Sequence, residues 1–425
     1  MNNNLYYDVV IIGGGASGIL TAIKIKSKFK QLSVAIVEGN DRIGKKLLLT
    51  GNGKCNLTNK NISPDNYITG NKAFLKTVLN QISYKELLRY FENFGLICKF
   101  DKEFRAYPFS EAASSVLDCF RLELERLKVD VITNSKIIDI HKKNKGFSVR
   151  TSDKKFFCNS LVIACGGKAA PKTGSDGYLF DVLFENFNLN IITPYPVLTG
   201  VNVFEEKILK ALHGVRAKAC VKLFINDKFI NSRFGEVQFR KDAVSGICVF
   251  DLSKYVSEYL TFNTINRHNC LGTLKLVFDF FPDITIDHLF SIIKKRIKLY
   301  PECSIDNIFS SVINKKLSCE IIKASKIKPN TVCSTIPFDK LRTLVSNFKN
   351  FSLSPSDTDS FLSAQATAGG IDCKEINPLT MMSDKIKNLY AVGEVLDVAG
   401  DCGGYNLHFA FISALICAKN FKYKD

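Results

Sequence analysis

Short apolar runs that end in glycine dominate the start of the chain. Residues 8–18 read DVVIIGGGASG, so four apolar residues precede three consecutive glycines. A continuous apolar run bounded by a turn signal is typical of a buried strand in a parallel sheet. A second run, VAIV at residues 34–37, follows at the distance that a helix would fill. The pattern predicts a strand, a glycine turn, a helix and a second strand.

The hydrophobic pattern predicts an α/β protein with a discontinuous, Rossmann-like domain at both chain ends and an insert between them. Helical spacing covers residues 72–130, and further short strands are expected near residues 129–133, 146–150 and 161–165. The predicted parts are a first α/β segment, an inserted β subdomain, an inserted helical subdomain and a C-terminal return to the first domain, at residues 1–194, 195–285, 286–350 and 351–425.

Within the insert, the residues FINDKF suggest a hairpin about Asn226 and Asp227. Residues 246–250 and 274–280 read as further strands, and the spacing turns helical from about Asp287 onward. After the insert, LYAVGE at residues 389–394 predicts a strand and turn. A final helix is expected to begin at the glycine pair of residues 403 and 404.

Composition restricts the class of protein. No apolar run reaches the length of about 18 residues that a membrane helix needs, so no membrane span is expected. The first strand is expected to begin near Tyr6, so no signal peptide is expected. None of the 14 cysteines has CxxC spacing, and the 5 histidines are scattered, so we expect reduced thiols, no metal site and a cytoplasmic protein.

The formal net charge is +17, and residues 196–350 contain 24 Lys and Arg against 14 Asp and Glu. A basic domain can indicate an anionic partner such as RNA. The alternative is a solvated surface whose lysines reflect the base composition of the genome. The sequence leaves both explanations open.

The glycine turn after the first strand has the residues of a dinucleotide site. Gly13 permits the tight turn, Gly15 lets the backbone approach a pyrophosphate, and Gly18 lets the helix pack on the strand. Ala16 and Ser17 begin that helix, whose free N–H groups attract phosphate. Glu38 follows the second strand, where a carboxylate can accept hydrogen bonds from a ribose.

A loop rich in glycine and lysine follows the second strand. Its small residues permit close backbone approach, and its lysines can neutralise phosphates. The alternative is a solvent loop. The predicted cofactor residues of this loop are Lys45, Lys46, Gly51, Gly53, Lys54 and Asn56.

The C-terminal segment suggests that the cofactor is FAD. Nucleotide-binding elements occur at both chain ends. This arrangement suits FAD, because the N-terminal part can bind its ADP half and the C-terminal part can cover its flavin. The second glycine turn lets a helix begin against the flavin, where its N-terminus stabilises negative charge. The predicted contacts in this part are Gly393, Glu394, Asp397, Gly403, Gly404, Tyr405 and Asn406, and Gly166 is a further predicted contact in the glycine turn after the strand near residues 161–165. For Asp397 the alternative is a loop cap.

These motifs resemble the BaiN/YhiN-type bacterial flavoproteins over nearly the whole chain. The resemblance rests on GGGASG at residues 13–18, GKKLLLTGNGKCNLTN at residues 44–59 and GEVLDVAGDCGGYN at residues 393–406. It implies an FAD-dependent oxidoreductase that reduces an activated C=C bond with NAD(P)H. Relatives are associated with reduction of conjugated ketones and of uracil to dihydrouridine in ribosomal RNA. No second complete GxGxxG is present, so NAD(P)H is expected to act as a transient donor.

Three departures from the family pattern bear on the site. Lys54 stands where Arg is usual, which keeps the charge but loses the bidentate fork. Phe104 replaces a glycine before Arg105, a substrate candidate. A Thr-His pair of the family is absent, and Arg240 and Lys241 lie in that region as further substrate candidates.

The sequence does not identify the proton donor. Cys55 and Tyr107 are candidates because they lie in loops that wrap the cofactor, although Cys55 also suits a small packed residue. Tyr405 can stack on flavin or substrate, or serve as a turn residue. The favoured substrate is ribosomal RNA bound through the basic insert. The rivals are a small-molecule ene reductase or amine oxidase, and a non-catalytic RNA-binding flavoprotein.

Overall fold

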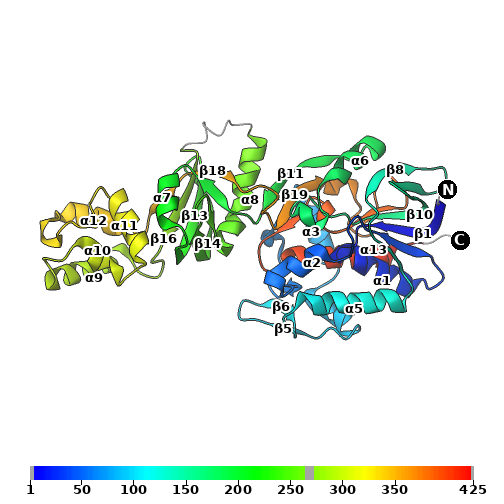
Figure 1. Ribbon diagram of the computed structural model, residues 1–425, viewed down its shortest axis with the longest axis horizontal. Coiled ribbons are helices and arrows are strands. Elements are labelled where there is room, and N and C mark those ends of the chain that lie inside the picture. The colour runs from blue at the N-terminus through cyan, green and yellow to red at the C-terminus, as the bar shows by residue number, and fades with distance from the viewer. Residues whose placement is uncertain (1–3, 264–271, 423–425) are drawn as a thin grey trace. The chain divides into compact units, whose positions relative to one another are not determined.

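The computed structural model describes residues 4–263 and 272–422, and the chain forms two compact units. Residues 1–196 and 364–425 form the first unit, and residues 197–363 form the second. The first unit is therefore discontinuous in sequence, with the second inserted between its parts. Figure 1 colours the two parts of the first unit blue to green and orange to red.

A seven-stranded sheet organises the first unit. Its order is β7-β2-β1-β10-β9-β8, and β20 also pairs with β10. The pairs β7–β2, β2–β1, β1–β10 and β10–β20 are parallel, whereas β9 and β8 join as an antiparallel hairpin. The bounds are β1 Asn4–Ile12, β2 Val34–Val37, β7 Asp130–Ile132, β8 Ile137–Lys142, β9 Phe147–Thr151, β10 Lys155–Ile163 and β20 Leu389–Ala391. The Rossmann-like parallel sheet predicted from the apolar runs is confirmed.

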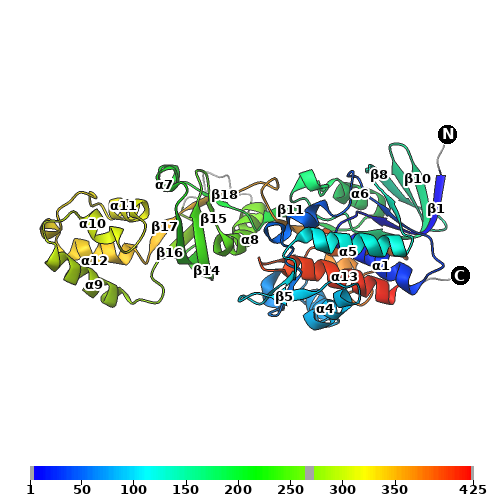
Figure 2. The same ribbon diagram turned by 60° about the horizontal axis from the view of Figure 1, so that its bottom comes forward.

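Two helices from opposite chain ends pack together in this unit. Helix α1 contacts α13 more extensively than any other helix, and it also contacts α5. Figure 2 shows these three helices side by side. The helices are α1 Ala16–Lys28, α2 Lys45–Leu49, α3 Lys72–Leu79, α4 Tyr84–Glu92, α5 Ala113–Arg126, α6 Tyr178–Phe187 and α13 Tyr405–Asn420, with short 3-10 turns at η1 Thr50–Gly53, η2 Pro64–Asn66, η3 Pro171–Thr173, η6 Cys373–Glu375 and η7 Gly393–Val395.

Three small sheets complete the first unit. They have the orders β3-β6-β5, β11-β19 and β21-β4. The β11–β19 and β21–β4 pairs each join a strand from the first part of the unit to one from the second part, so both parts are needed for the fold. The bounds are β3 Thr58–Asn59, β4 Tyr67–Ile68, β5 Cys98–Phe100, β6 Arg105–Pro108, β11 Ile191–Val197, β19 Ala366–Ile371 and β21 Ala399–Gly400.

The second unit contains another seven-stranded sheet, of order β17-β16-β13-β14-β15-β12-β18. Strands β13 and β14 form the hairpin expected about Asn226 and Asp227, both of which have positive φ. The strands are β12 Val201–Val203, β13 Arg216–Ile225, β14 Lys228–Phe239, β15 Val244–Ser245, β16 Leu274–Asp279, β17 Phe351–Leu353 and β18 Pro355–Thr358. The described helices are α7 Glu206–Leu212, α8 Ile247–Phe262, α9 Ile286–Leu299, α10 Ile305–Ser310, α11 Lys315–Ala324 and α12 Phe338–Asn347, with η5 at Cys333–Thr335.

The structure corrects the sequence interpretation of the insert in two places. The strand expected at residues 246–250 is the first turn of α8, which follows Gly246 at a φ of 108°. The short apolar run GICVF fits either a strand or a helix. Helix α8 is 16 residues long, because helical apolar spacing continues after this run. The expected return to the first domain at residue 351 is also too early, because β17 and β18 pair within the second unit's sheet.

The β and helical parts of the insert share one hydrophobic core. Val237 and Phe278 from the sheet belong to the same buried cluster as Ile293, Leu317 and Leu344 from the helices. The helical spacing from Asp287 onward is confirmed by α9, α10, α11 and α12. These two predicted subdomains are therefore packed as one body.

Candidate active site

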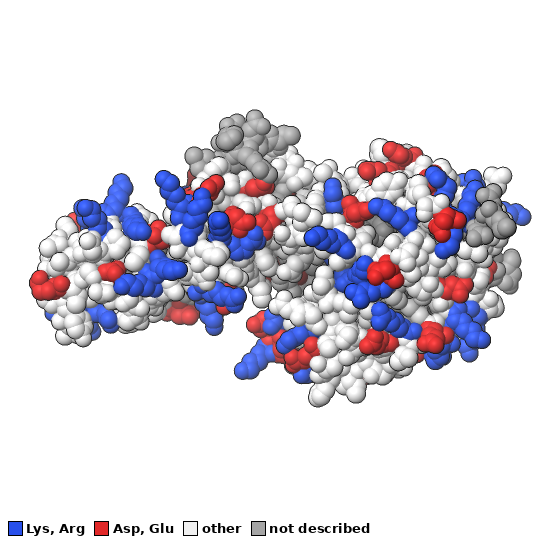
Figure 3. All heavy atoms as spheres, viewed as in Figure 1, with Lys and Arg blue, Asp and Glu red and all other residues white. Residues whose placement is uncertain are grey.

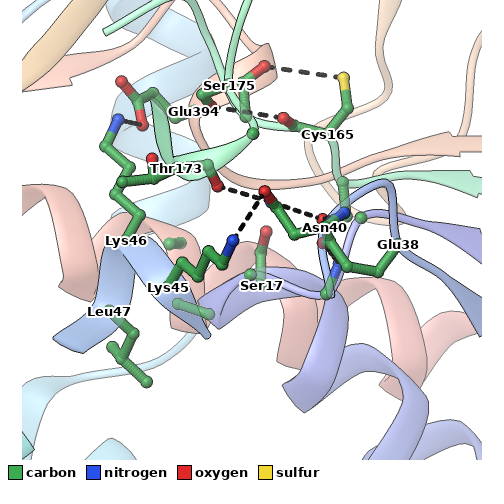
Figure 4. A pocket seen from close by; sticks show the side chains of 18 of the residues that line it. Ser17, Glu38, Asn40, Lys45, Lys46, Leu47, Cys165, Thr173, Ser175 and Glu394 are labelled. Carbon is green, nitrogen blue, oxygen red and sulfur yellow. Dashed lines mark hydrogen bonds and ion pairs between the residues drawn. The ribbon is translucent and has the colours of Figure 1, made fainter. Parts of the chain in front are cut away.

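A cavity of about 390 Å³ lies at the carboxyl ends of the parallel strands of the first unit. Ile12, Val37 and Ala164, which end or directly follow β1, β2 and β10, all line it. Ligands of open α/β sheets bind at this edge. Ten predicted cofactor residues line the cavity, namely Gly13, Gly15, Ala16, Ser17, Glu38, Lys45, Lys46, Gly166, Glu394 and Asn406. Figure 4 shows several of them.

The three motif glycines have different surroundings. A Cβ at Gly13 would lie 2.5 Å from the carbonyl oxygen of Ala164, and one at Gly18 would overlap the carbonyl oxygen of Gly13. Both glycines therefore allow close packing within the protein. A Cβ at Gly15 would meet nothing within 4 Å, although Gly15 lines the cavity. The space in front of Gly15 is thus available to a ligand at the start of α1.

Glu38 is held by the backbone around it. One carboxylate oxygen accepts a 2.8 Å hydrogen bond from the Gly14 N–H. The other accepts 2.8 Å bonds from the backbone N–H and the side-chain amide of Asn40. The Asn40 amide also donates to the carbonyl of Thr173 at 2.9 Å. Asn40 therefore fixes Glu38 and ties the loop after β2 to the loop after β10.

An ion pair joins the two parts of the first unit at the cavity. Lys46 Nζ lies 2.7 Å from one carboxylate oxygen of Glu394, and the other oxygen accepts from the Thr367 N–H at 2.8 Å. Lys45 is paired with Asp41 at 2.5 Å and bonds the Asn40 side-chain oxygen at 3.3 Å. Figure 4 shows Lys46 reaching toward Glu394 and Lys45 reaching toward Asn40.

The second half of the predicted wrapping loop lies outside this cavity. Lys54 is exposed and pairs with Glu111 at 2.7 Å. Cys55 is fully buried in the core at a φ of 59°, and burial raises the pKa of its thiol to about 12. A buried, protonated thiol with no surface on the cavity suits packing better than acid catalysis. The other predicted cofactor residues outside the lining are Gly18, Gly51, Gly53, Asn56, Gly393, Asp397, Gly403, Gly404 and Tyr405.

The glycine pair before α13 faces protein. Gly404 has a φ of 95°, and its Cβ would lie 2.5 Å from the Asn56 side-chain oxygen and 2.8 Å from the Thr58 carbonyl. Tyr405 is buried, and its ring meets Tyr67 edge-on with centroids 5.9 Å apart. The predicted start of the helix is right, but these residues pack against β3 and β4. The helix reaches the cavity through other residues of its first two turns, Asn406 and Ala410.

Asp397 is a buried cap of two loops. Its carboxylate accepts hydrogen bonds from the backbone N–H groups of Gly70 at 2.8 Å and Gly369 at 3.1 Å. Burial raises the pKa of this carboxyl. The alternative interpretation of Asp397 as a loop cap therefore matches its contacts.

The remaining candidates of the first unit lie on β6. Tyr107 is half-buried, burial raises the pKa of its hydroxyl, and it does not line the cavity. Arg105 is paired with Asp101 and Glu103, both at 2.7 Å. None of the three proposed catalytic side chains, Cys55, Tyr107 and Tyr405, is brought to the cavity lining.

In the second unit, Arg240 already has carboxylate partners. It lies 2.6 Å from Asp359 and 3.0 Å from Asp242, which ties the end of β14 to the segment after β18. Its charge is therefore neutralised locally, whereas Lys241 is exposed. These contacts make Arg240 a structural residue of the second unit and a weak candidate for binding phosphate.

Several lining residues were not assigned from the sequence. Lys136, which pairs with Asp176 at 2.8 Å, comes from the segment before β8 and carries no motif. Ser175 and Asp176 belong to the second glycine segment, so their place after β10 was the available signal. Further unassigned lining residues are Gly14, Asn40, Arg42, Gly44, Thr50, Cys165, Thr173, Gly174 and Gln365.

A family model described as "HI0933-like protein Rossmann domain" matches residues 7–420. The chain belongs to the HI0933-like family. This is a family of FAD-dependent oxidoreductases, as the motifs predicted.

Among the described helices, none is both long and apolar enough to cross a membrane. The described His, Cys, Asp and Glu residues form no group that could hold a metal ion.

Curated relatives match over almost the full length of the chain. A Clostridium scindens protein named "3-dehydro-bile acid delta(4,6)-reductase" is 32% identical over 409 residues, which cover 96% of this chain and 97% of the relative. A Haemophilus influenzae protein named "Ribosomal RNA dihydrouridine synthase" is 26% identical over 420 residues, with coverage of 97% and 98%.

Solved structures share the fold at low sequence identity. The 3-ketosteroid delta1-dehydrogenase from Sterolibacterium denitrificans is 12% identical with a TM-score of 0.50, and the match covers 97% of this chain and 99% of that one.

Proposed function

We propose that this HI0933-like protein binds FAD in the cavity and uses NAD(P)H to reduce an electron-poor carbon–carbon double bond. The observation that carries the proposal is the cavity itself. It lies at the carboxyl edge of the sheet, Gly15 leaves its space open, and an acidic residue ends the second strand. These are the three elements of a dinucleotide site.

The residues present fit FAD. Gly15 and the first turn of α1 would hold the pyrophosphate, because the N–H groups of that turn have no partner within the helix. Glu38 would hold the ribose, and its position is already fixed by Gly14 and Asn40. The Lys46–Glu394 pair would close the site from both parts of the unit.

When bound, FAD supplies hydride transfer, which the side chains of this protein cannot perform alone. Reduction of a double bond adds a hydride to one carbon and a proton to its neighbour, while NAD(P)H supplies the two electrons. The protein's own part is to bind and orient. Lys45 and Lys46 lie at the start of α2 beside the cavity, where each is paired with a carboxylate, so they would position the loops around the cofactor.

For the substrate, we favour uracil in ribosomal RNA. The basic insert supports this choice, because clustered lysines suit a polyanion. The relative from Haemophilus influenzae carries the matching name at 26% identity. The second candidate is a conjugated ketone, supported by the relative at 32% identity that is named as a bile acid reductase.

Anaerobic reduction and reoxidation test this proposal. The purified protein should show a flavin absorbance that bleaches with NADH or NADPH. The bleached sample should then recover its absorbance when unmodified ribosomal RNA is added, and dihydrouridine should form. Recovery with an enone steroid instead would select the second candidate. Absence of bleaching with either nicotinamide would refute the NAD(P)H-driven reaction.

A further inference from the structure

The helical part of the second unit has a strong excess of positive charge. Residues 286–350 contain 12 Lys and Arg against 5 Asp and Glu. Several of these lysines have no carboxylate partner among the described residues, namely Lys294, Lys295, Lys298, Lys316, Lys326, Lys328 and Lys340. Figure 3 shows more blue than red side chains over the part formed by α9 to α12. This charge is therefore available to an outside partner.

Helix α9 presents the most concentrated part of this charge. Its sequence from residue 294 reads KKRIK, while Leu289 and Ile293 on its other side are buried. Lys294 and Lys298 are four residues apart, so they lie one above the other on one exposed stripe. Lys295 lies on the adjacent exposed stripe. The buried side of the helix fixes this orientation, because its apolar residues belong to the core of the second unit.

Exposed aromatic rings accompany these charges. Phe338, at the start of α12, is 52% exposed although it packs edge-on against Phe290 with centroids 5.2 Å apart. Lys294 Nζ lies 5.4 Å from the Phe338 ring centroid. Just after α9, Tyr300 is 51% exposed and the Arg296 guanidinium lies 5.9 Å from its ring centroid. Phe338 thus lies beside the Lys294 stripe, whereas Tyr300 accompanies Arg296 on another side of α9.

We propose that this α9–α12 face, formed by Lys294, Lys295, Lys298 and Phe338, binds single-stranded RNA. Lysines bind the phosphate backbone, and exposed rings stack with unpaired bases. An acidic protein would match the charge but gives no reason for rings placed beside lysines. The choice of RNA rests on the proposed function. The location rests on the contacts of this face. It differs from the predicted site at Arg240 and Lys241, because the charge of Arg240 is neutralised by Asp242 and Asp359.

Charge reversal on the full-length protein tests the face. K294E/K298E should weaken binding of a fluorescein-labelled single-stranded oligouridylate roughly ten-fold, and the salt dependence should flatten by about 0.7 per lost phosphate contact. F338L keeps an apolar side chain against Phe290 but removes the stacking surface, so it should weaken binding with little change in the salt slope. K143E/K145E is the matched control, because it makes the same charge change in the exposed turn between β8 and β9.

Flavin reduction by NADPH, measured on the same samples, separates this inference from the proposed function. Normal reduction with weakened RNA binding in K294E/K298E is the expected result. RNA binding that is absent in the wild type, or equally weakened in K143E/K145E, would overturn the inference even with normal reduction. If the wild type binds RNA but its flavin is not reduced by NADPH, the proposed function is refuted, whereas RNA binding by the α9–α12 face is still supported.

Discussion

The two glycine turns that precede α1 and α13 look alike in sequence but have different surroundings. The first, at residues 13–18, has one glycine that faces open cavity. The second, at residues 403 and 404, has a glycine whose Cβ would meet Asn56 and Thr58. Both turns begin helices that pack against each other. A glycine before a helix therefore indicates close approach, and only the structure shows whether a ligand or the protein itself approaches.

The largest effect is expected at the protein-facing turn. Gly404→Leu combines a φ of 95° with a Cβ that lies too close to β3, so it should lower the free energy of unfolding by on the order of 3 kcal/mol. Chemical denaturation should show this loss with or without added FAD. Unchanged stability together with lost FAD affinity would instead assign Gly404 to the cofactor.

The opposite result is expected at the cavity-facing turn. Gly15→Val places its side chain in open space, so the FAD-free protein should lose only the modest free energy that valine costs at the N-cap of α1, much less than Gly404→Leu loses. FAD affinity should fall about 100-fold, because the side chain occupies the space left for the pyrophosphate. Gly15→Ala serves as the smaller control. Equal losses of stability in Gly15→Val and Gly404→Leu would contradict the distinction between a cavity-facing and a protein-facing turn.

A milder effect is expected at Glu38. Glu38→Ala removes a charged acceptor for a ribose, which should cost roughly 1.5–3 kcal/mol of FAD binding. It also leaves the Gly14 N–H without its partner. Asn40→Ala is the informative companion, because it removes the support of Glu38 while the carboxylate remains. Titration of the FAD-free protein with FAD measures both, and an unchanged affinity in Glu38→Ala would exclude the ribose contact.

The smallest effect concerns His408, in the first turn of α13. His408 is fully buried against Thr58, and burial lowers its pKa to about 3. The unfolded chain therefore binds a proton that the folded chain does not, so stability is lost as the pH falls below the ordinary pKa of about 6.5. Between about pH 7 and pH 5 this contribution is about 2 kcal/mol. Urea denaturation of His408→Gln should lack this part of the pH dependence, and an identical pH dependence would show that His408 is protonated in the fold.

The sequence predicted those parts of the fold that depend on local patterns. The apolar runs at β1, β2 and β10 and the turn at Asn226 and Asp227 were found because their signals lie within a few residues. Helix α8 was missed because GICVF is too short to distinguish a strand from a helix. The end of the insert was missed because only the pairing of β17 and β18 assigns them to the second sheet.

For the candidate site, as for the fold, the sequence predicted the residues that belong to local motifs and not those that only folding brings together. Gly15, Glu38 and Lys46 belong to motifs, and their lining positions follow from the ends of β1 and β2. Lys136 could not be found, because it reaches the cavity from a segment about 100 residues beyond β2 without a motif. The burial of Cys55, which weakens it as a candidate donor, could not be predicted, because a motif does not reveal burial. Side-chain exposure depends on packing that only the folded chain provides.

The most direct test of the central claim is the identity of the molecule in the cavity. The account predicts that heat or acid releases FAD from the purified protein, in an amount close to one molecule per chain. Chromatography and the visible spectrum of the supernatant measure both quantities. Release of FAD from the wild type but not from Gly15→Val would place it at the first glycine turn. Recovery of NAD alone, or of no nucleotide even after incubation with FAD, would contradict the account.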